Sequence, residues 1–378
     1  MDLRIDRYNL KIGMALFFIL GNAVLNLEAI PVLHYLFSGM RVLFVGYAML
    51  LVLKNWEVGK FTWLVGAFYL VWGWITYQAQ GAMNIWGSYC INTIGISIWL
   101  YYALLHSPKD TIRILCNIFS IFIYLNFITM LLQLDDFLDG FLLGTNYNQI
   151  GSTLLCGIIT YSVAYKMQVK GLWPVLLLCT VSVLTTLYVG SMTSTTGCIM
   201  ATVFLFIPRA RLRRAIIISL VVFYVLFQAV VVFLRNDLSN AKAAAYLVED
   251  VMKKDLTFTN RTLVWLQAYD DVMESPKTGY GAQDPEWFND RYEVKSSHNI
   301  LLQIMLYGGY ILLGLFVLVI CISAVHAMKG QSPYAQYIGF GVCTFFFMMI
   351  METYNLTLIF YTLCLLFYSQ NLVEENEQ

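Results

Sequence analysis

The sequence predicts an all-α, polytopic membrane protein with about twelve transmembrane helices. Of its 378 residues, 59% are hydrophobic and only 12% are charged, a composition that excludes a soluble globular protein. Apolar runs recur along the whole chain, each of about 20 residues, the length a helix needs to cross a bilayer. A helix also satisfies its own backbone hydrogen bonds in lipid. The formal net charge of zero argues against a nucleic-acid partner.

The predicted spans divide the chain into three parts. Residues 1–234 hold nine spans, residues 235–298 form a long polar loop, and residues 299–378 hold three spans and a cytoplasmic tail. Lys and Arg flank the spans on alternate sides, whereas the short loops between them on the other side contain none, which places both termini inside and the long loop outside. The predicted spans are 12–27, 32–53, 61–77, 89–106, 111–133, 149–165, 172–189, 195–208, 215–234, 299–327, 334–351 and 355–371.

Neither a cofactor nor a metal is expected. The outer segments contain no Asp-x-Asp pair and no cluster of His and Cys, the usual ligands of such sites. The eight cysteines lie in or beside apolar segments without a CxxC pair, and they predict small buried side chains.

Arg41 is the one Lys or Arg that lies in the middle of a predicted span, 32–53. A charge there costs about 2.5–3.5 kcal/mol on insertion scales, and such residues normally face a partner or a wet cavity. Arg41 is therefore either a snorkelling or structurally paired arginine, or an arginine that binds an anion in a central cavity. We favour anion binding.

Two carboxamides, Asn146 and Asn148, close the predicted outer loop 134–148. Such groups can donate and accept hydrogen bonds with sugar hydroxyls, but they are also common helix caps, and both interpretations stay open. The small hydroxylated residues of 190–197 favour close helix packing, with a binding site as the alternative.

The long loop carries a candidate anion site. Arg261 and Trp265 are spaced to share one face of a helix that Pro276 ends. Arg261 would then stand in the first turn, where the helix dipole disfavours a cation unless an anion is bound. A solvated surface arginine is the alternative.

Two further motifs follow in the loop. Gly279 and Gly281 permit a tight turn and a close backbone approach. Ser296 and Ser297 are natural N-caps, which would place His298 in the first turn of the next span, where the charged imidazole is disfavoured. A neutral imidazole at the membrane surface is suited to act as a general base; a simple polar tip is the alternative.

Together these motifs resemble the O-antigen ligase/polymerase superfamily, which includes the Wzy-type polymerases of bacterial surface polysaccharides. The resemblance rests on Thr259-Asn-Arg261-x3-Trp265, on Pro276-x2-Gly279-x-Gly281, and on His298-Asn299-x-Leu301 followed by Gly308-Gly309. Members commonly have Gly before the arginine, where this chain has Asn260.

The resemblance implies a fold related to the lipid-carrier-dependent (GT-C-like) membrane glycosyltransferases and a metal-independent reaction on the outer face of the bacterial plasma membrane. It implies an oligosaccharide on undecaprenyl pyrophosphate as the donor. His298 would be the base and Arg261 the leaving-group cation. The expected substrate-binding residues are Arg41, Arg291, Arg235, Asn146, Asn148, Trp265, Gly279, Gly281 and Asn299.

We therefore expect a polymerase of an O-antigen or capsule, which transfers glycan from one lipid carrier to a sugar hydroxyl on another lipid-linked repeat unit. Besides membrane lipid, a flippase and a chain-length regulator of the same pathway are the expected partners. The first alternative is a ligase that uses a non-identical acceptor. The second is a polysaccharide or solute transporter, against which stand the single large outer loop and the lack of an internal repeat. A non-catalytic scaffold is less consistent with the isolated Arg41.

Overall fold

Apolar helices make up nearly all of the described chain, and each predicted span coincides with one or two of them. The computed structural model describes residues 7–55, 58–138, 140–144, 147–233 and 261–372. The helices of the bundle are α1 (Arg7–Val24), α2 (Pro31–Asn55), α3 (Lys60–Gln78), α4 (Met83–His106), α5 (Pro108–Leu131), α7 (Tyr147–Lys166), α8 (Leu172–Tyr188), α9 (Met192–Leu205), α10 (Ala210–Phe227) with its π-helical extension η1 (Gln228–Phe233), α14 (Ile300–Lys329), α15 (Ala335–Met348) and α16 (Leu356–Phe367).

Length and composition separate these helices into two groups. Five are long and apolar enough to cross a membrane, and others are apolar but shorter. The structure is therefore compatible with a polytopic membrane protein, while the count of twelve spans stays a prediction. The long helices are Pro31–Lys54, Met83–His106, Pro108–Leu131, Ala210–Phe233 and Ile300–Lys329.

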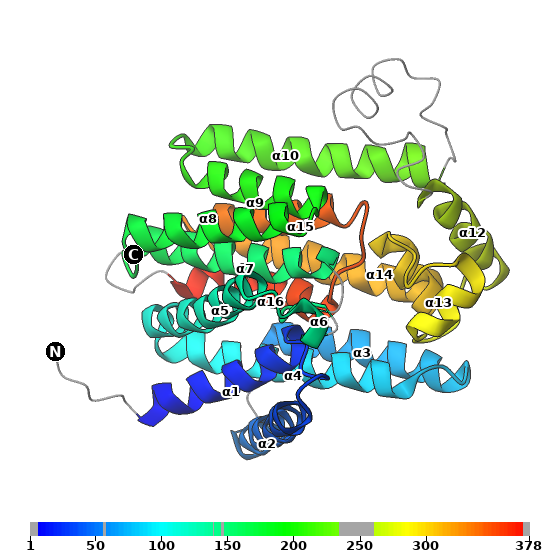
Figure 1. Ribbon diagram of the computed structural model, residues 1–378, viewed down its shortest axis with the longest axis horizontal. Helices are drawn as coiled ribbons and strands as arrows, with labels where there is room; N and C mark the ends of the chain where they lie inside the picture. The colour runs from blue at the N-terminus through cyan, green and yellow to red at the C-terminus, as the bar shows by residue number, and fades with distance from the viewer. Residues whose placement is uncertain (1–6, 56–57, 139, 145–146, 234–260, 373–378) are drawn as a thin grey trace.

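The predicted outer loop contributes two short helices at one end of the bundle, α12 (Arg261–Glu274) and α13 (Pro285–Tyr292). Figure 1 shows both at the right, whereas α1 begins at the left. α12 begins and ends where its residue spacing predicts, but α13 was not predicted. A further helix expected over 237–255 lies outside the described residues.

α16 forms the centre of the bundle. Every one of its residues is buried, and it packs against α4, α14 and α15. Figure 1 shows it in red, enclosed by the other helices. Its N-cap, Asn355, accepts a hydrogen bond from the Thr357 amide at 2.9 Å and donates one to the Ala23 carbonyl at 2.7 Å. The segment before α16 is thereby fixed against the end of α1.

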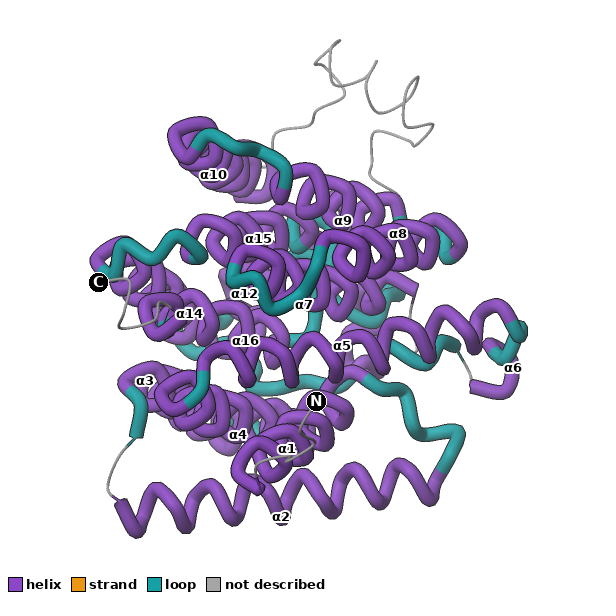
Figure 2. The backbone as a smooth tube through the Cα atoms, turned by 90° about the vertical axis from the view of Figure 1, so that its left-hand side faces the viewer, coloured by secondary structure: helices purple, strands orange, loops and turns teal. Residues whose placement is uncertain are grey.

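α2 departs from the direction of its neighbours. Most helices run across Figure 1, whereas α2 is seen nearly end-on there and side-on along one edge in Figure 2. It packs mainly against α1 and α4, and apolar side chains such as Val32, Leu43 and Leu50 are exposed on it. The helix predicted over 32–53 is present, but it crosses the bundle obliquely.

Candidate active site

The two predicted catalytic residues meet on one carboxylate, that of Glu352. The Arg261 guanidinium pairs with Glu352 through Nη2 and Oε1. His298 Nδ1 lies 3.1 Å from the other oxygen, Oε2. The Glu352 side chain is only 5% exposed, so the pairings form away from bulk solvent, where charge interactions are strongest. We call Arg261, His298 and Glu352 the charged triad.

Glu352 was missed by the sequence analysis. It lies in the short segment between α15 and α16, which was interpreted only as an outer loop free of Lys and Arg. The one signal available was its type, because a carboxylate between two strongly apolar segments needs a partner. Its partners are 91 and 54 residues away along the chain, beyond the reach of local patterns.

Asn299 is a structural residue that positions His298. It is fully buried, and its side-chain oxygen accepts hydrogen bonds from the amides of Leu301 and Leu302, which makes it the N-cap of α14. Its amide nitrogen donates to Gln228 Oε1 (3.1 Å) and to the Ile350 carbonyl (3.3 Å). The cap thus ties the start of α14 to the segment that carries Glu352.

The expected cap at Ser296 and Ser297 is therefore wrong, because Asn299 takes that position. His298 precedes the cap instead of lying in the first turn, so the helix-dipole argument for a neutral imidazole does not apply. His298 also has a left-handed backbone, with φ of 50°. Such a conformation costs about 1–3 kcal/mol in a non-glycine residue and is characteristic of functional sites.

Gly279 and Gly281 dock the outer loop onto the bundle. Both have positive φ, 57° and 76°. A β carbon on Gly279 would collide with the Leu306 carbonyl, and one on Gly281 would collide with Thr76 of α3. The tight approach allows the Tyr280 amide to donate to the Leu306 carbonyl at 2.7 Å. These glycines support the site through packing.

The receiving surface for this loop is a break within α14. Gly308 and Gly309 leave helical geometry, and Gly309 has φ of 59° and ψ of −158°. The break frees the Leu306 carbonyl for Tyr280, and the Tyr310 amide donates to the Pro276 carbonyl at 2.8 Å. The Gly-Gly motif is therefore the point at which the loop joins the span.

Trp265 and Arg291 contact residues other than those of the charged triad. Trp265 is 2% exposed and packs edge-on against Phe227. Arg291 stacks over Trp287, with 4.4 Å from its guanidinium carbon to the ring centroid, and lies 3.5 Å from Asp271. Both side chains stabilise the outer helices in this conformation, and their predicted contact with substrate stays a prediction.

Asp271 also accepts a hydrogen bond from Tyr292 at 2.5 Å. Burial, and next this bond to a carboxylate, raise the pKa of Tyr292. The phenol therefore stays protonated and donates, which holds α13 against α12.

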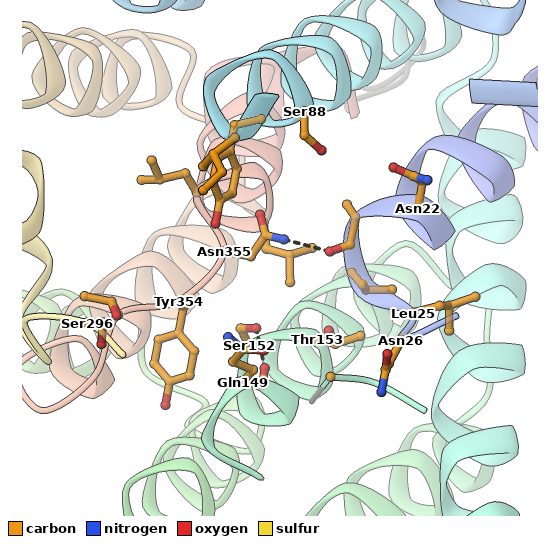
Figure 3. Close-up of a pocket in the computed structure, with 18 of the residues that line it drawn as sticks. Asn22, Leu25, Asn26, Ser88, Gln149, Ser152, Thr153, Ser296, Tyr354 and Asn355 are labelled. Carbon is orange, nitrogen blue, oxygen red and sulfur yellow. Dashed lines mark hydrogen bonds between the residues drawn. The ribbon is translucent and has the colours of Figure 1, made fainter. Parts of the chain in front are cut away.

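A polar cavity of about 530 Å³ lies beside the triad. Its lining includes Thr353, which follows Glu352, and Ser296, two residues before His298, but none of the three triad residues lines it. Figure 3 shows its labelled hydroxyl and carboxamide groups converging from several elements, Asn355 and Gln149 among them.

Arg41 lines this cavity. Its Nη1 donates to Asn22 Oδ1 at 2.5 Å, and it lies 3.3 Å from both Ser88 Oγ and Asn92 Oδ1. The wet cavity expected for Arg41 is present, but the residue is not brought to the charged triad. The two predicted cation sites are separate.

Three other predicted residues cannot be placed in the site. Arg235 and Asn146 lie outside the described residues, and Asn148 belongs to the first turn of α7 with a side chain that is not described. Their neighbours Gly144 and Gln149 line the cavity. In the described part of the chain, no group of three or more His, Cys, Asp and Glu is arranged to hold a metal ion.

Comparison with known families identifies the region that contains most of these motifs. Residues 174–317 match the family model Wzy_C, described as O-antigen ligase. This stretch is similar to the O-antigen ligase family. The match includes Arg261, His298 and the broken start of α14, and it confirms the resemblance to the O-antigen ligase/polymerase superfamily. Glu352 and Arg41 lie outside the matched residues.

A search of curated proteins found no match to the chain. Wzy_C proteins are membrane glycosyltransferase-like enzymes, ligases and polymerases alike. The similarity to this family, together with the many apolar helices, is consistent with a multi-pass bacterial membrane protein.

Proposed function

We propose that this protein polymerises a bacterial surface polysaccharide from undecaprenyl-pyrophosphate-linked repeat units on the extracytoplasmic face of the membrane. The observation that carries the proposal is the meeting of Arg261 and His298 on Glu352. Glycan transfer from a diphosphate needs a base for the acceptor hydroxyl and a cation for the leaving group. The triad supplies one of each within a few ångströms.

In the proposed reaction, an acceptor sugar hydroxyl attacks the anomeric carbon of the donor glycan. A new C–O glycosidic bond forms, the C–O bond to the diphosphate breaks, and undecaprenyl diphosphate leaves with the bonding electron pair. The proton of the hydroxyl passes to His298. A single direct displacement would invert the anomeric centre.

Glu352 acts in this scheme as a positioning residue. Its contact with Nδ1 orients the imidazole and stabilises the imidazolium that forms when Nε2 takes the proton, as carboxylate–histidine pairs do in hydrolases. Among the described residues, His298 Nε2 makes no hydrogen bond, so it is available to the acceptor. The left-handed backbone at His298 fixes this orientation further.

Arg261 would serve the leaving diphosphate. Only its Nη2 is bonded to Glu352, and within the described residues its Nη1 and Nε make no hydrogen bond. A guanidinium can bind a carboxylate and a phosphate oxygen at once, because its five N–H groups point along different edges. The carboxylate then keeps the cation in place between turnovers.

A ligase is the second candidate, because the matched family model is described as an O-antigen ligase. The triad chemistry is the same for both reactions, and only the acceptor differs. A ligase passes the finished glycan to a non-identical acceptor, whereas a polymerase uses a second lipid-linked repeat unit.

The test uses the purified full-length chain in lipid nanodiscs, supplied with undecaprenyl-diphosphate-linked repeat units alone. A ladder of longer glycans with release of undecaprenyl diphosphate supports the polymerase. Transfer that occurs only after a non-identical lipid acceptor is added identifies the ligase. If neither acceptor is extended by wild-type protein, the proposed function is wrong.

A deletion strain gives an independent answer. Loss of a polymerase leaves single lipid-linked repeat units, whereas loss of a ligase leaves long untransferred chains on the carrier. Mass spectrometry of extracted lipid-linked intermediates separates the two.

A further inference from the structure

A polar stripe on α2 faces the cavity. His34, Ser38 and Arg41 follow one another at i, i+4 and i+7, so they share one face of the helix, and all three line the cavity. Exposed apolar side chains cover much of the rest of α2. An otherwise apolar edge helix thus presents its one arginine to an enclosed polar space.

The bonding of Arg41 differs from that of an ordinary structural arginine. Its three acceptors among the described residues, on Asn22, Ser88 and Asn92, are all neutral. No carboxylate among the described residues pairs with it, and its buried Nε has no hydrogen-bond partner there. A guanidinium that is partly withdrawn from water without a counter-charge is costly, and a bound oxyanion would remove that cost.

The lining of the cavity matches a hydroxylated ligand. Carboxamides and hydroxyls from α1, α4, α7 and the segment before α16 surround it, and Figure 3 shows Asn22, Ser88, Gln149, Thr153 and Asn355 around one space. These groups both donate and accept hydrogen bonds, as sugar hydroxyls require. A volume of about 530 Å³ is within the usual range of small-ligand sites.

The charged residues that line the cavity also favour a ligand that carries a negative charge. Besides Arg41 it includes an exposed lysine, Lys295, and one exposed carboxylate, Glu28, which makes no ion pair with Arg41. At its other side the cavity reaches Ser296 and Thr353, next to His298 and Glu352. A ligand that fills it would extend from Arg41 toward the charged triad.

We propose that this cavity is a second substrate subsite, in which Arg41 binds an oxyanion of the glycolipid while the carboxamides and hydroxyls bind its sugar. The proposal rests on the proposed function for the identity of the glycolipid. The oxyanion comes from one of two sources, an acidic sugar of the repeat unit or the diphosphate of a carrier. Arg41 is then a specificity-determining residue, separate from the Arg261 site.

Three variants of the full-length protein test the site. Arg41→Gln removes the charge but keeps hydrogen-bonding groups. Asn22→Asp places a permanent carboxylate on Arg41 with almost no change in shape, so the protein should be at least as heat-stable as wild type while the anion site is filled internally. Arg113→Gln is the matched control, because Arg113 is exposed and already paired with Asp110.

Binding is measured in nanodiscs with three probes, undecaprenyl diphosphate, a glucuronate-containing disaccharide and its neutral glucose counterpart. Arg41→Gln and Asn22→Asp should each weaken the binding of an anionic probe about tenfold or more, the loss expected for one charge-assisted contact. Both variants should bind the neutral disaccharide as the wild type does, and the Arg113→Gln protein should bind every probe as the wild type does. When the same binding measurements are repeated in proteins that also carry Arg261→Gln, the loss of affinity caused by the Arg41 substitution should remain.

The outcomes separate the sources and the proposals. A loss confined to the diphosphate identifies the carrier, and a loss confined to the glucuronate identifies an acidic sugar. Equal affinity of wild type, Arg41→Gln and Asn22→Asp for both anionic probes overturns the subsite. If the affinities are equal but His298→Ala abolishes glycan transfer, the proposed function stands and the Arg41 subsite is rejected. If binding depends on Arg41 but the wild-type protein transfers no glycan, the subsite stands and the proposed function is rejected.

Discussion

Two arginines of this protein stand in opposite electrostatic settings. Arg261 is paired with the buried carboxylate of Glu352, whereas the described partners of Arg41 are all neutral amides and hydroxyls. A charge that has its counter-ion is held in a defined place, as a residue in a transition-state site must be. A charge that lacks one retains its capacity to bind an incoming anion. The contrast assigns chemistry to the first region and substrate recognition to the second.

The largest effect is expected at His298. His298→Ala should lower glycan transfer by about 10²–10⁴-fold, because it removes the proposed general base. Transfer is measured in nanodiscs, with protein level and melting temperature recorded alongside. His106→Ala is the matched control, since His106 is an exposed histidine whose described contacts are with the Tyr102 carbonyl and the Tyr8 ring. Near-normal polymer from the His298 variant would remove it as the base.

Glu352→Gln tests the same contrast between the two arginines by removing the negative charge that pairs with Arg261. The substitution leaves Arg261 without its counter-charge, and loss of one partner of a buried ion pair costs about 3–5 kcal/mol. We expect a lower melting temperature together with slower transfer. Glu352→Asp retains the charge and should restore part of both. If Glu352→Gln lowers stability but leaves the rate per folded molecule unchanged, Glu352 holds the fold and does not position His298.

The two arginines should differ in what they contribute to stability. Arg261→Gln removes one cation from the buried Glu352 carboxylate and should lower the melting temperature clearly. Arg41→Gln replaces charge-assisted bonds to neutral groups, worth about 1.5–3 kcal/mol each, by the neutral bonds of glutamine, and it relieves a charge that no described carboxylate pairs. Heat denaturation of both variants in one detergent compares them directly. An equal or larger drop for Arg41→Gln would contradict the contrast between the two regions.

Gly309→Ala tests whether the two regions are supported independently. A β carbon there collides with backbone atoms of Pro276 and Lys277, and the backbone conformation is accessible essentially to glycine alone. The cost should be at least about 1–3 kcal/mol, with a loss of transfer as the outer loop shifts. Binding at the Arg41 cavity should weaken less than transfer does, because its lining includes loop residues such as Gln283 and Ser296 but also residues of α1, α4 and α7.

Gly314→Ala is the control on the same helix. No atom lies within 4 Å of its β-carbon position, and alanine favours helix. It should be neutral or slightly stabilising. A Gly309→Ala protein that transfers glycan normally would show that the loop does not need the break in α14.

Sequence patterns predicted the helices well and the site in part. Apolar runs located the bundle helices because burial in lipid imposes composition directly. Arg261 stood out at the start of a predicted helix in the polar loop, and His298 stood out where that loop meets the next span. Glu352 did not, because its role depends on contacts that only the folded bundle brings together. The oblique direction of α2 is likewise set by packing, which leaves no periodic signal in the chain.

One expectation, the cap of α14, failed because more than one residue type can serve that purpose. Ser and Asn are nearly equal as N-caps, so the sequence alone could not show that Asn299 would exclude Ser296 and Ser297. The glycines 279 and 281 correctly predicted tight turns, but the surface that demands them belongs to α3 and α14. Glycine propensity predicted the tight turns, and the close packing against α3 and α14 explains why glycine is needed there.

The break at Gly308 and Gly309 has a consequence for biogenesis. The outer loop is synthesised before α14, yet its backbone hydrogen bonds at Pro276 and Tyr280 are completed only by residues 306–310. The loop therefore has no finished docking surface until that helix has been inserted beside α3. We therefore expect α14 to insert before the outer loop docks. A nascent chain arrested before residue 306 would contain Arg261 and His298 but would lack the backbone contacts that hold the loop in place.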